Sequence, residues 1–234
     1  MTVIAVLICD EPSPEQSKTH GNYHEMFKRL VSSSLNNETD LIPFDARTCN
    51  FPSLSDYQCI IITGSKASAY DDTPWIKNLI SFISTAFKTS SIKICGICFG
   101  HQIIAMALGG LVTRNPLNVW EAGPYQIACS SIFKPTLIIN QMHRDVVVKV
   151  PDDFQVYATS KFCENQGMEF GNRVITIQGH PEFANDYVKE LLLVRRGVVI
   201  SEDCVDEALD ALNSCQSNDG VEWMQNAFKY LEIS

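Results

Sequence analysis

The chain has 234 residues, 45% of them hydrophobic, which is enough to build one large domain around a substantial core. Its formal net charge of -9, without a long run of either sign, argues against a nucleic-acid-binding protein, which would have a basic patch. No segment approaches the roughly 20 apolar residues of a membrane-spanning helix, so we expect small-molecule or protein partners and no membrane contact.

Buried strands and amphipathic helices alternate along the first half of the chain. Continuous runs rich in Val and Ile predict strands at 3–9, 59–63, 92–97 and, much later, 173–177. Apolar residues at helical spacing predict helices at 23–33, 75–87 and 99–108. This alternation predicts right-handed crossovers and an α/β fold of three layers, with a mainly parallel central sheet flanked by helices.

The middle of the chain, residues 111–159, shows a different pattern. Short β-like pieces at 124–129, 136–140 and 155–158 are separated by Pro, Asn and Asp, which predicts a small mixed or antiparallel extension. Helical patterns follow at 183–196, 202–215 and 221–231, with a polar loop at 214–220. We therefore expect a single domain over residues 1–234, with C-terminal helices at about 202–232 packed on it.

Nine cysteines, an odd number without a framework spacing, favour reduced thiols. The N-terminal "MTVIAVLICDEPSP" lacks a basic segment, which indicates a buried strand rather than a signal peptide. We therefore expect a cytoplasmic protein that also has access to the nucleus. Cys95 and Cys98 form a CxxC pair, but Cys95 lies within the predicted strand, which argues against redox chemistry.

The segment "GICFGHQ" places Cys98 between a strand and a helix, with Gly96 and Gly100 on either side. A strand that ends in Gly-x-nucleophile-x-Gly and turns directly into a helix is typical of a nucleophile elbow. The positive end of the helix favours a thiolate, and its free N–H groups can bind an oxyanion. The alternative is one more buried cysteine at a glycine-rich turn.

A cysteine nucleophile needs a base and a group that orients the base. His20 and His24 flank an early helix, and His101 lies inside the helix after Cys98, so we expect structural or surface roles for all three. His180 ends the strand pattern in "VITIQGHPEF", and Glu182 follows two residues later. Because sites in α/β sheets collect at the carboxyl ends of strands, His180 and Glu182 are the candidate base and orienting group, although Glu182 suits a helix cap as well.

These two motifs, "GICFGHQ" and "QGHPEF", resemble those of the class I glutamine amidotransferases of the triad type, and the resemblance covers nearly the whole chain. It implies the flavodoxin-like fold of that family, with Cys98 as nucleophile, His180 as base and Glu182 as its partner. It also implies an oxyanion hole formed by the N–H groups of Phe99 and of Gly64 or Ser65. Here "TGSKAS" stands where many members have Gly-Gly-Pro.

Further matches concern the substrate. The resemblance implies that Gln102 contacts the substrate, and that "QMHRDVV" binds the α-amino and α-carboxylate end of glutamine through His143 and Asp145. Met142 and Arg144 replace residues common elsewhere in the family. His143 fits a hydrogen-bonded structural role equally well. Neither a cofactor nor a metal ion is expected.

The resemblance implies hydrolysis of a γ-glutamyl amide through a cysteine thioester, with glutamine giving glutamate and ammonia. A synthase on another chain would then be a partner that accepts the ammonia. A stand-alone γ-glutamyl peptidase, acting on glutathione-like peptides, is the first alternative, and "VWEAGPYQI" resembles stand-alone members. A catalytically silent binding or regulatory protein is the second alternative.

Overall fold

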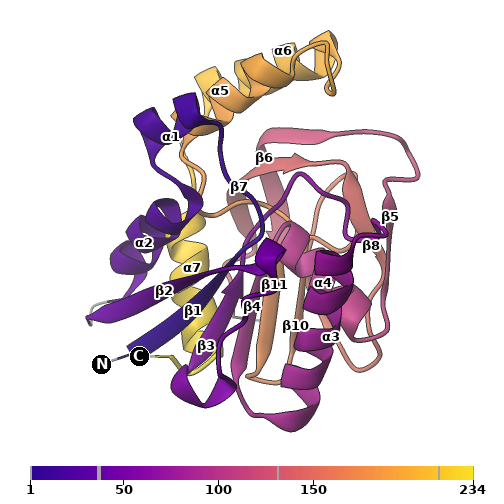
Figure 1. Ribbon diagram of the computed structural model, residues 1–234. Helices are drawn as coiled ribbons and strands as arrows, with labels where there is room; N and C mark the ends of the chain where they lie inside the picture. The colour runs from indigo at the N-terminus through magenta and orange to yellow at the C-terminus, as the bar shows by residue number, and fades with distance from the viewer. Residues whose placement is uncertain (1, 36–37, 131, 216, 234) are drawn as a thin grey trace.

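The structure is a computed structural model that describes residues 2–35, 38–130, 132–215 and 217–233. Within these residues, one nine-stranded sheet forms the centre of the molecule (Figure 1). Its strands, in spatial order, are β2 (Thr39–Asp45), β1 (Thr2–Ile8), β3 (Cys59–Ile62), β4 (Lys93–Ile97), β11 (Val174–Ile177), β10 (Gly167–Phe170), β9 (Gln155–Thr159), β6 (Glu121–Cys129) and β7 (Thr136–His143).

The sheet is parallel from β2 to β11 and antiparallel from β11 to β7. A separate small antiparallel sheet pairs β5 (Leu111–Arg114) with β8 (Asp145–Lys149). The predicted α/β class, with a mainly parallel centre and an antiparallel extension in the middle of the chain, is therefore confirmed.

Helices cover both faces of the sheet. On one face lie α2 (Tyr23–Ser34) and α7 (Gly220–Tyr230), and on the other lie α3 (Pro74–Thr89) and α4 (Phe99–Ala107) (Figure 1). At one end of the strands are α1 (Pro14–His20), α5 (Asn185–Arg195) and α6 (Glu202–Ser214), of which α6 packs on β6. Short 3₁₀ turns at Ala46–Thr48 and Leu54–Asp56 complete the elements.

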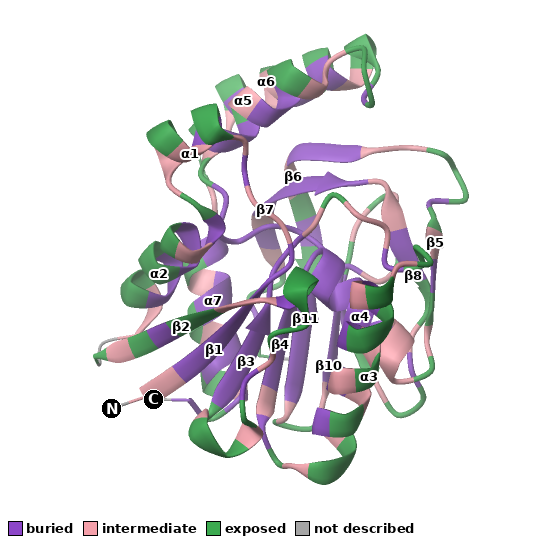
Figure 2. Ribbon diagram, viewed as in Figure 1, coloured by how far each residue is buried: buried purple, intermediate pink, exposed green. Residues whose placement is uncertain are grey.

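Strand periodicity explains the two cores. Along β1, the side chains of Ile4 and Val6 enter one core with α2 and α7, whereas Ala5 and Leu7 enter the other with α3 and α4. The central strands are buried throughout, while the outer surfaces of the helices are exposed (Figure 2). Burial on both faces is why these strands lack a polar–apolar alternation in the sequence.

Several elements were missed or misplaced by the sequence patterns. The strands β2, β5, β8 and β10 and the helix α1 were not predicted, and the helix after the "HPE" motif begins at Asn185 rather than at residue 183. β2 is an edge strand that contains Pro43 and several exposed residues, so it lacks the buried-strand pattern. The predicted polar loop 214–220 includes Gln216, which lies outside the described residues.

Among the described helices, none is both long and apolar enough to cross a membrane.

Candidate functional site

Cys98 occupies a sharp turn between β4 and α4. Its backbone has φ 52° and ψ -103°, in a region that residues other than glycine rarely adopt. A Cβ atom at Gly96 would lie 2.8 Å from the carbonyl of Gly100, and one at Gly100 would collide with the backbone of Ile62. Both glycines are therefore required by close packing, as the predicted elbow demands.

Three neighbouring parallel strands bring the candidate residues to one edge of the sheet. β4 lies between β3 and β11, so the segments that follow these strands are adjacent. Gly64 follows β3, Cys98 follows β4 and His180 follows β11. A Cβ atom at Gly64 would lie 2.8 Å from Cε1 of His180 and 3.6 Å from Cβ of Cys98, so Gly64 lies directly beside both side chains.

His180 is buried and held from several sides. Its Nδ1 lies 2.8 Å from Oε1 of Glu182, its ring stacks on Phe183 at 4.0 Å, and its backbone N–H donates to the carbonyl of Asn140. Because α5 begins at Asn185 after Ala184 as its N-cap, Glu182 does not cap that helix. The second reading of Glu182, as a helix cap, is therefore wrong.

The electrostatics of His180 favour its protonated form. Burial lowers its pKa, but the charges and hydrogen bonds of Cys98 and Glu182 outweigh burial and raise the pKa to about 10. A doubly protonated imidazole would donate from one nitrogen to Glu182 and present the other to the sulfur. The arrangement can therefore stabilise a thiolate–imidazolium pair and can deliver a proton beside the sulfur.

Gln178 is a neighbour of the sulfur that the sequence patterns missed. Its side-chain Nε2 donates to Sγ of Cys98 at 3.5 Å, while its Oε1 accepts from Nε2 of Gln102 at 3.1 Å. Gln178 is fully buried directly after β11. The sequence offered one indication of this role: Gln178 is a polar residue two positions before His180, and side chains two positions apart in an extended segment point to the same face.

A cavity of about 330 Å³ opens over Cys98, His180 and Glu182. The other residues that were predicted to bind the substrate or the oxyanion also line this cavity: Gly64, Ser65, Gln102, His143 and Asp145. Phe99 is the exception. The Phe99 ring packs on Trp75 instead, with ring centroids 5.5 Å apart, and its N–H is the first of α4. The first N–H groups of a helix have no intrahelical acceptor.

A larger groove of about 1080 Å³ lies at the opposite, amino-terminal ends of the strands, beside Thr2, Lys93 and Arg173. None of the predicted site residues lines it. The volume of a cavity alone is a poor guide here, because the smaller cavity has Cys98, the candidate nucleophile, and the buried titratable groups.

The far wall of the site cavity presents polar atoms at its surface. Oδ2 of Asp145 accepts from Oγ of Ser68 at 2.6 Å, and Oδ1 lies 3.6 Å from Nε of Arg144. Arg144 and Asp145 thus form an ion pair, and both residues line the cavity. A wall that has one positive and one negative side chain suits a ligand that has both an ammonium and a carboxylate group.

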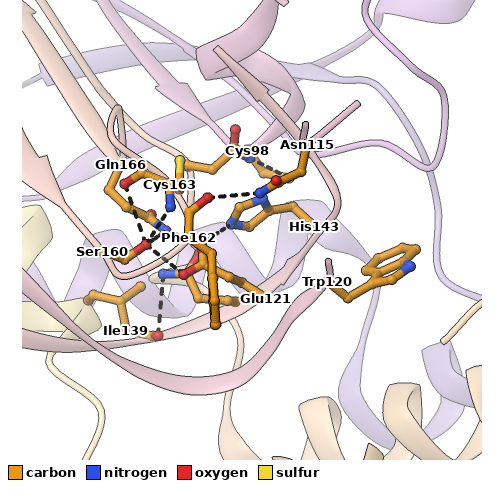
Figure 3. A network of polar contacts seen from close by, with 12 residues as sticks. Cys98, Asn115, Trp120, Glu121, Ile139, His143, Ser160, Phe162, Cys163 and Gln166 are labelled. Atoms are coloured by element: carbon orange, nitrogen blue, oxygen red, sulfur yellow. Dashed lines mark hydrogen bonds and ion pairs between the residues drawn. The ribbon is translucent and has the colours of Figure 1, made fainter. Parts of the chain in front are cut away.

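Behind this wall, the buried side chains of Glu121 and His143 are in contact. They face each other across β6 and β7, with Oε2 of Glu121 3.2 Å from Nε2 of His143 (Figure 3). Burial raises the pKa of Glu121, but hydrogen bonds from His143, Ser160 and Gln166 outweigh it and hold the pKa below its ordinary value. The chain thus keeps a charged carboxylate next to the predicted substrate-binding segment.

His20, His24 and His101 have partners other than Cys98. Nε2 of His20 pairs with Glu190 at 2.9 Å, and Nε2 of His24 contacts the carbonyl of Leu41 at 3.0 Å. His101 is fully buried against Thr176 at 2.7 Å, and burial, with the nearby His143, lowers its pKa to about 3.

Four of the other eight cysteines are buried, which disfavours their thiolate forms. Burial raises the pKa of Cys9 to about 12 and raises that of Cys59, Cys95 and Cys163 as well. In the described part of the chain, no group of three or more His, Cys, Asp or Glu side chains is arranged to hold a metal ion.

Comparison with known proteins gives a consistent result. Residues 20–195 match the family described as glutamine amidotransferase class-I. A glutamine amidotransferase-like protein of Schizosaccharomyces pombe is 36% identical over 92% of this chain and 94% of its own. Gamma-glutamyl peptidase 4 of Arabidopsis thaliana is 30% identical over 75% of this chain and 73% of its own.

Solved structures with a similar fold include proteins that are also described as glutamine amidotransferases. The crystal structure of a glutamine amidotransferase from Thermotoga maritima superimposes with a TM-score of 0.73 at 19% identity, covering 99% of this chain and 98% of that one. At this identity the likeness shows the architecture alone.

Proposed function

Because this chain belongs to the class I glutamine amidotransferase family, we propose that it is a hydrolase that cleaves a γ-glutamyl amide bond. The observation that supports this proposal is that Gly64, Cys98 and His180 lie together at the carboxyl ends of three neighbouring strands. Glu182 is hydrogen-bonded to the imidazole of His180. In the proposal, Cys98 is the nucleophile, His180 the general acid and base, and Glu182 the group that orients His180.

In the first step the Cys98 thiolate attacks the γ-carbonyl carbon. The carbonyl oxygen becomes an oxyanion, which the N–H groups of Phe99 and of Gly64 or Ser65 bind. His180 gives its proton to the leaving nitrogen, the carbon–nitrogen bond breaks, and a γ-glutamyl thioester remains on Cys98. A His180 pKa of about 10 supports this step, because the imidazole then has the required proton at neutral pH.

In the second step water hydrolyses the thioester. Neutral His180 takes a proton from the attacking water, the carbon–sulfur bond breaks, and the thiolate and glutamate leave. Glu182 stabilises the imidazolium that forms each time. Gln178 would support the sulfur as its charge changes, since its N–H already points at Sγ.

The glutamyl end of the substrate is proposed to bind the far wall of the cavity. Asp145 suits the α-ammonium group and Arg144 suits the α-carboxylate, because both residues line the cavity and they have opposite charges. Gln102 and His143 support this wall, since both contact the backbone carbonyl of Asp145, at 3.1 and 3.2 Å.

A second candidate function is that of a γ-glutamyl peptidase. One observation favours it over a glutaminase: the residues that line the cavity with Cys98 and His180 also include Trp120, Arg195 and Val199. Relatives named gamma-glutamyl peptidase also match most of this chain. A guanidinium at this position suits the carboxylate of a leaving peptide, whereas ammonia leaves without such a contact.

The deciding experiment compares the two leaving groups. The purified protein is incubated with glutamine and, separately, with glutathione, and glutamate, ammonia and Cys-Gly are quantified, with Cys98→Ala as the control. Ammonia from glutamine supports the glutaminase, and Cys-Gly from glutathione supports the peptidase. If neither substrate is cleaved faster than by Cys98→Ala, a stand-alone hydrolase is excluded, and the silent binding protein or a partner-dependent glutaminase remains.

A further inference from the structure

Glu121 is a buried carboxylate with three partners and no exposure of its own. Its side chain is 0% exposed, Oε1 accepts from Ser160 at 2.5 Å, and Oε2 accepts from Gln166 at 2.7 Å (Figure 3). Burying a carboxylate is costly unless donors and an opposite charge surround it. A buried charged group at this position lowers the stability of the fold compared with an apolar one, so we infer that Glu121 has a functional role.

The third partner of Glu121 is the ring of His143. Both of its ring nitrogens face acceptors: Nε2 lies 3.2 Å from Oε2 of Glu121, and Nδ1 lies 3.2 Å from the backbone carbonyl of Asp145. The Glu121 carboxylate on one side and the Asp145 carbonyl on the other therefore fix the orientation of the His143 ring.

The Asp145 carbonyl is the point where this network joins the site. It accepts from His143 on one side and from Nε2 of Gln102 on the other. Gln102 also bonds Gln178, whose amide reaches the sulfur of Cys98. A continuous set of polar contacts thus runs from Glu121 through His143, Asp145, Gln102 and Gln178 to the sulfur of Cys98. Of the residues between its ends, Asp145 is the one whose carboxylate is proposed to bind the substrate.

We propose that Glu121 is a positioning residue for substrate binding: through His143 it fixes the backbone of Asp145, and with it the carboxylate that receives the glutamyl end. The proposal rests on the proposed function for the identity of that substrate. Glu121 is not itself in the cavity, so it acts through His143 rather than by contact. Such a residue affects binding of the glutamyl group more than the reactivity of the thiol.

The test compares two labels for Cys98 in the full-length protein. One is a γ-electrophilic glutamine analogue, a diazo ketone that needs the glutamyl-binding wall, and the other is iodoacetamide, which does not. For Glu121→Gln we expect the analogue to react about ten- to hundredfold more slowly, with iodoacetamide labelling within about twofold of wild type. A matching rise in KM for the cleaved substrate, larger than the change in kcat, is expected.

A double-mutant cycle with His143→Gln shows whether the effect passes through that residue. If it does, adding Glu121→Gln to His143→Gln slows the analogue little further. Ser160→Ala is the control, because it removes one hydrogen bond to the Glu121 carboxylate but leaves the contact between Glu121 and His143. It should lower the stability of the protein without slowing its reaction with the analogue.

Three results would overturn the proposal. If the analogue labels wild type and Glu121→Gln at the same rate, Glu121 has no positioning role, whereas the proposed function of the protein is unaffected. An equal slowing of both labels, or the same slowing in Ser160→Ala, would indicate general loss of structure. If the analogue fails to label Cys98 even in wild type, the proposed function fails, and the inference fails with it.

Discussion

Gly64 and His180 lie so close that no side chain fits between them: a Cβ atom at position 64 would be 2.8 Å from Cε1 of the imidazole. Gly64 does not have the positive φ of a glycine turn, so its substitution brings a steric effect without backbone strain. We predict that Gly64→Ala displaces His180 and lowers kcat by about a hundredfold or more, measured with whichever substrate is cleaved.

Gly171→Ala is the matched control for that variant. A Cβ atom at Gly171 would meet nothing within 4 Å, although its φ of +38° makes a side chain mildly unfavourable. We expect full activity and a small loss of stability. Equal activity in Gly64→Ala and wild type would show that the imidazole can move without consequence, contrary to the proposed role of His180.

Selective alkylation tests the reactivity of the thiol. Near pH 6 we expect iodoacetamide to label Cys98 ahead of the other eight cysteines, by about tenfold over exposed Cys49, because a histidine beside a thiol raises its reactivity and His180 lines the same cavity. Peptide mass spectrometry identifies the labelled residue. Labelling of Cys49 first, or equal labelling, would contradict a stabilised thiolate.

The protonation of His180 can be measured directly. Its pKa of about 10, against an ordinary 6.5, depends on the charges of Cys98 and Glu182, because burial alone acts in the opposite direction. In Cys98→Ala, NMR titration of the imidazole should therefore give a lower pKa than in wild type. An unchanged value would show that the sulfur does not interact with His180.

The same shift sets the pH dependence. A raised pKa means that the stabilisation from protonated His180 is fully present below pH 6.5 and is lost as the pH rises through about 10. Thioester formation should decline over the upper part of that range, because the leaving nitrogen loses its acid. The initial rate of product release between pH 6 and pH 11 tests this prediction, and a rate that still rises above pH 10 would exclude His180 as the acid.

Glu182→Gln separates charge from shape. The amide can still meet Nδ1 of His180, but it removes the negative charge 2.8 Å away and can hold the wrong tautomer. We predict that kcat falls by about two to four orders of magnitude, while the fold is kept, as circular dichroism would show. A variant with normal kcat would reduce Glu182 to a structural role.

The sequence reveals the strand-end residues because their neighbours are distinctive. Glycines on both sides of Cys98 and the proline after His180 mark sharp turns, and parallel strands bring their ends together without further information. The fold class could be predicted for a similar reason: β1, β3, β4 and β11 are buried on both faces, so each appears in the sequence as a continuous apolar run.

The networks around those residues could not be predicted, because they depend on register. Glu121 meets His143 only because β6 and β7 pair in one particular alignment, which the short, proline-interrupted segments of the middle region do not specify. Gln178 reaches the sulfur through the position of β11 beside β4. The edge strand β2, with Pro43 and an exposed face, gave too little hydrophobic pattern to be found.

The central claim is that Cys98 forms a γ-glutamyl thioester, and trapping that adduct tests it most directly. The protein is mixed with glutamine or with glutathione, quenched in acid within the first turnover, and digested for mass spectrometry. We predict one γ-glutamyl group on the peptide that contains Cys98, absent from Cys98→Ala. Product release without an adduct on Cys98, or with cleavage retained in Cys98→Ala, would contradict the account.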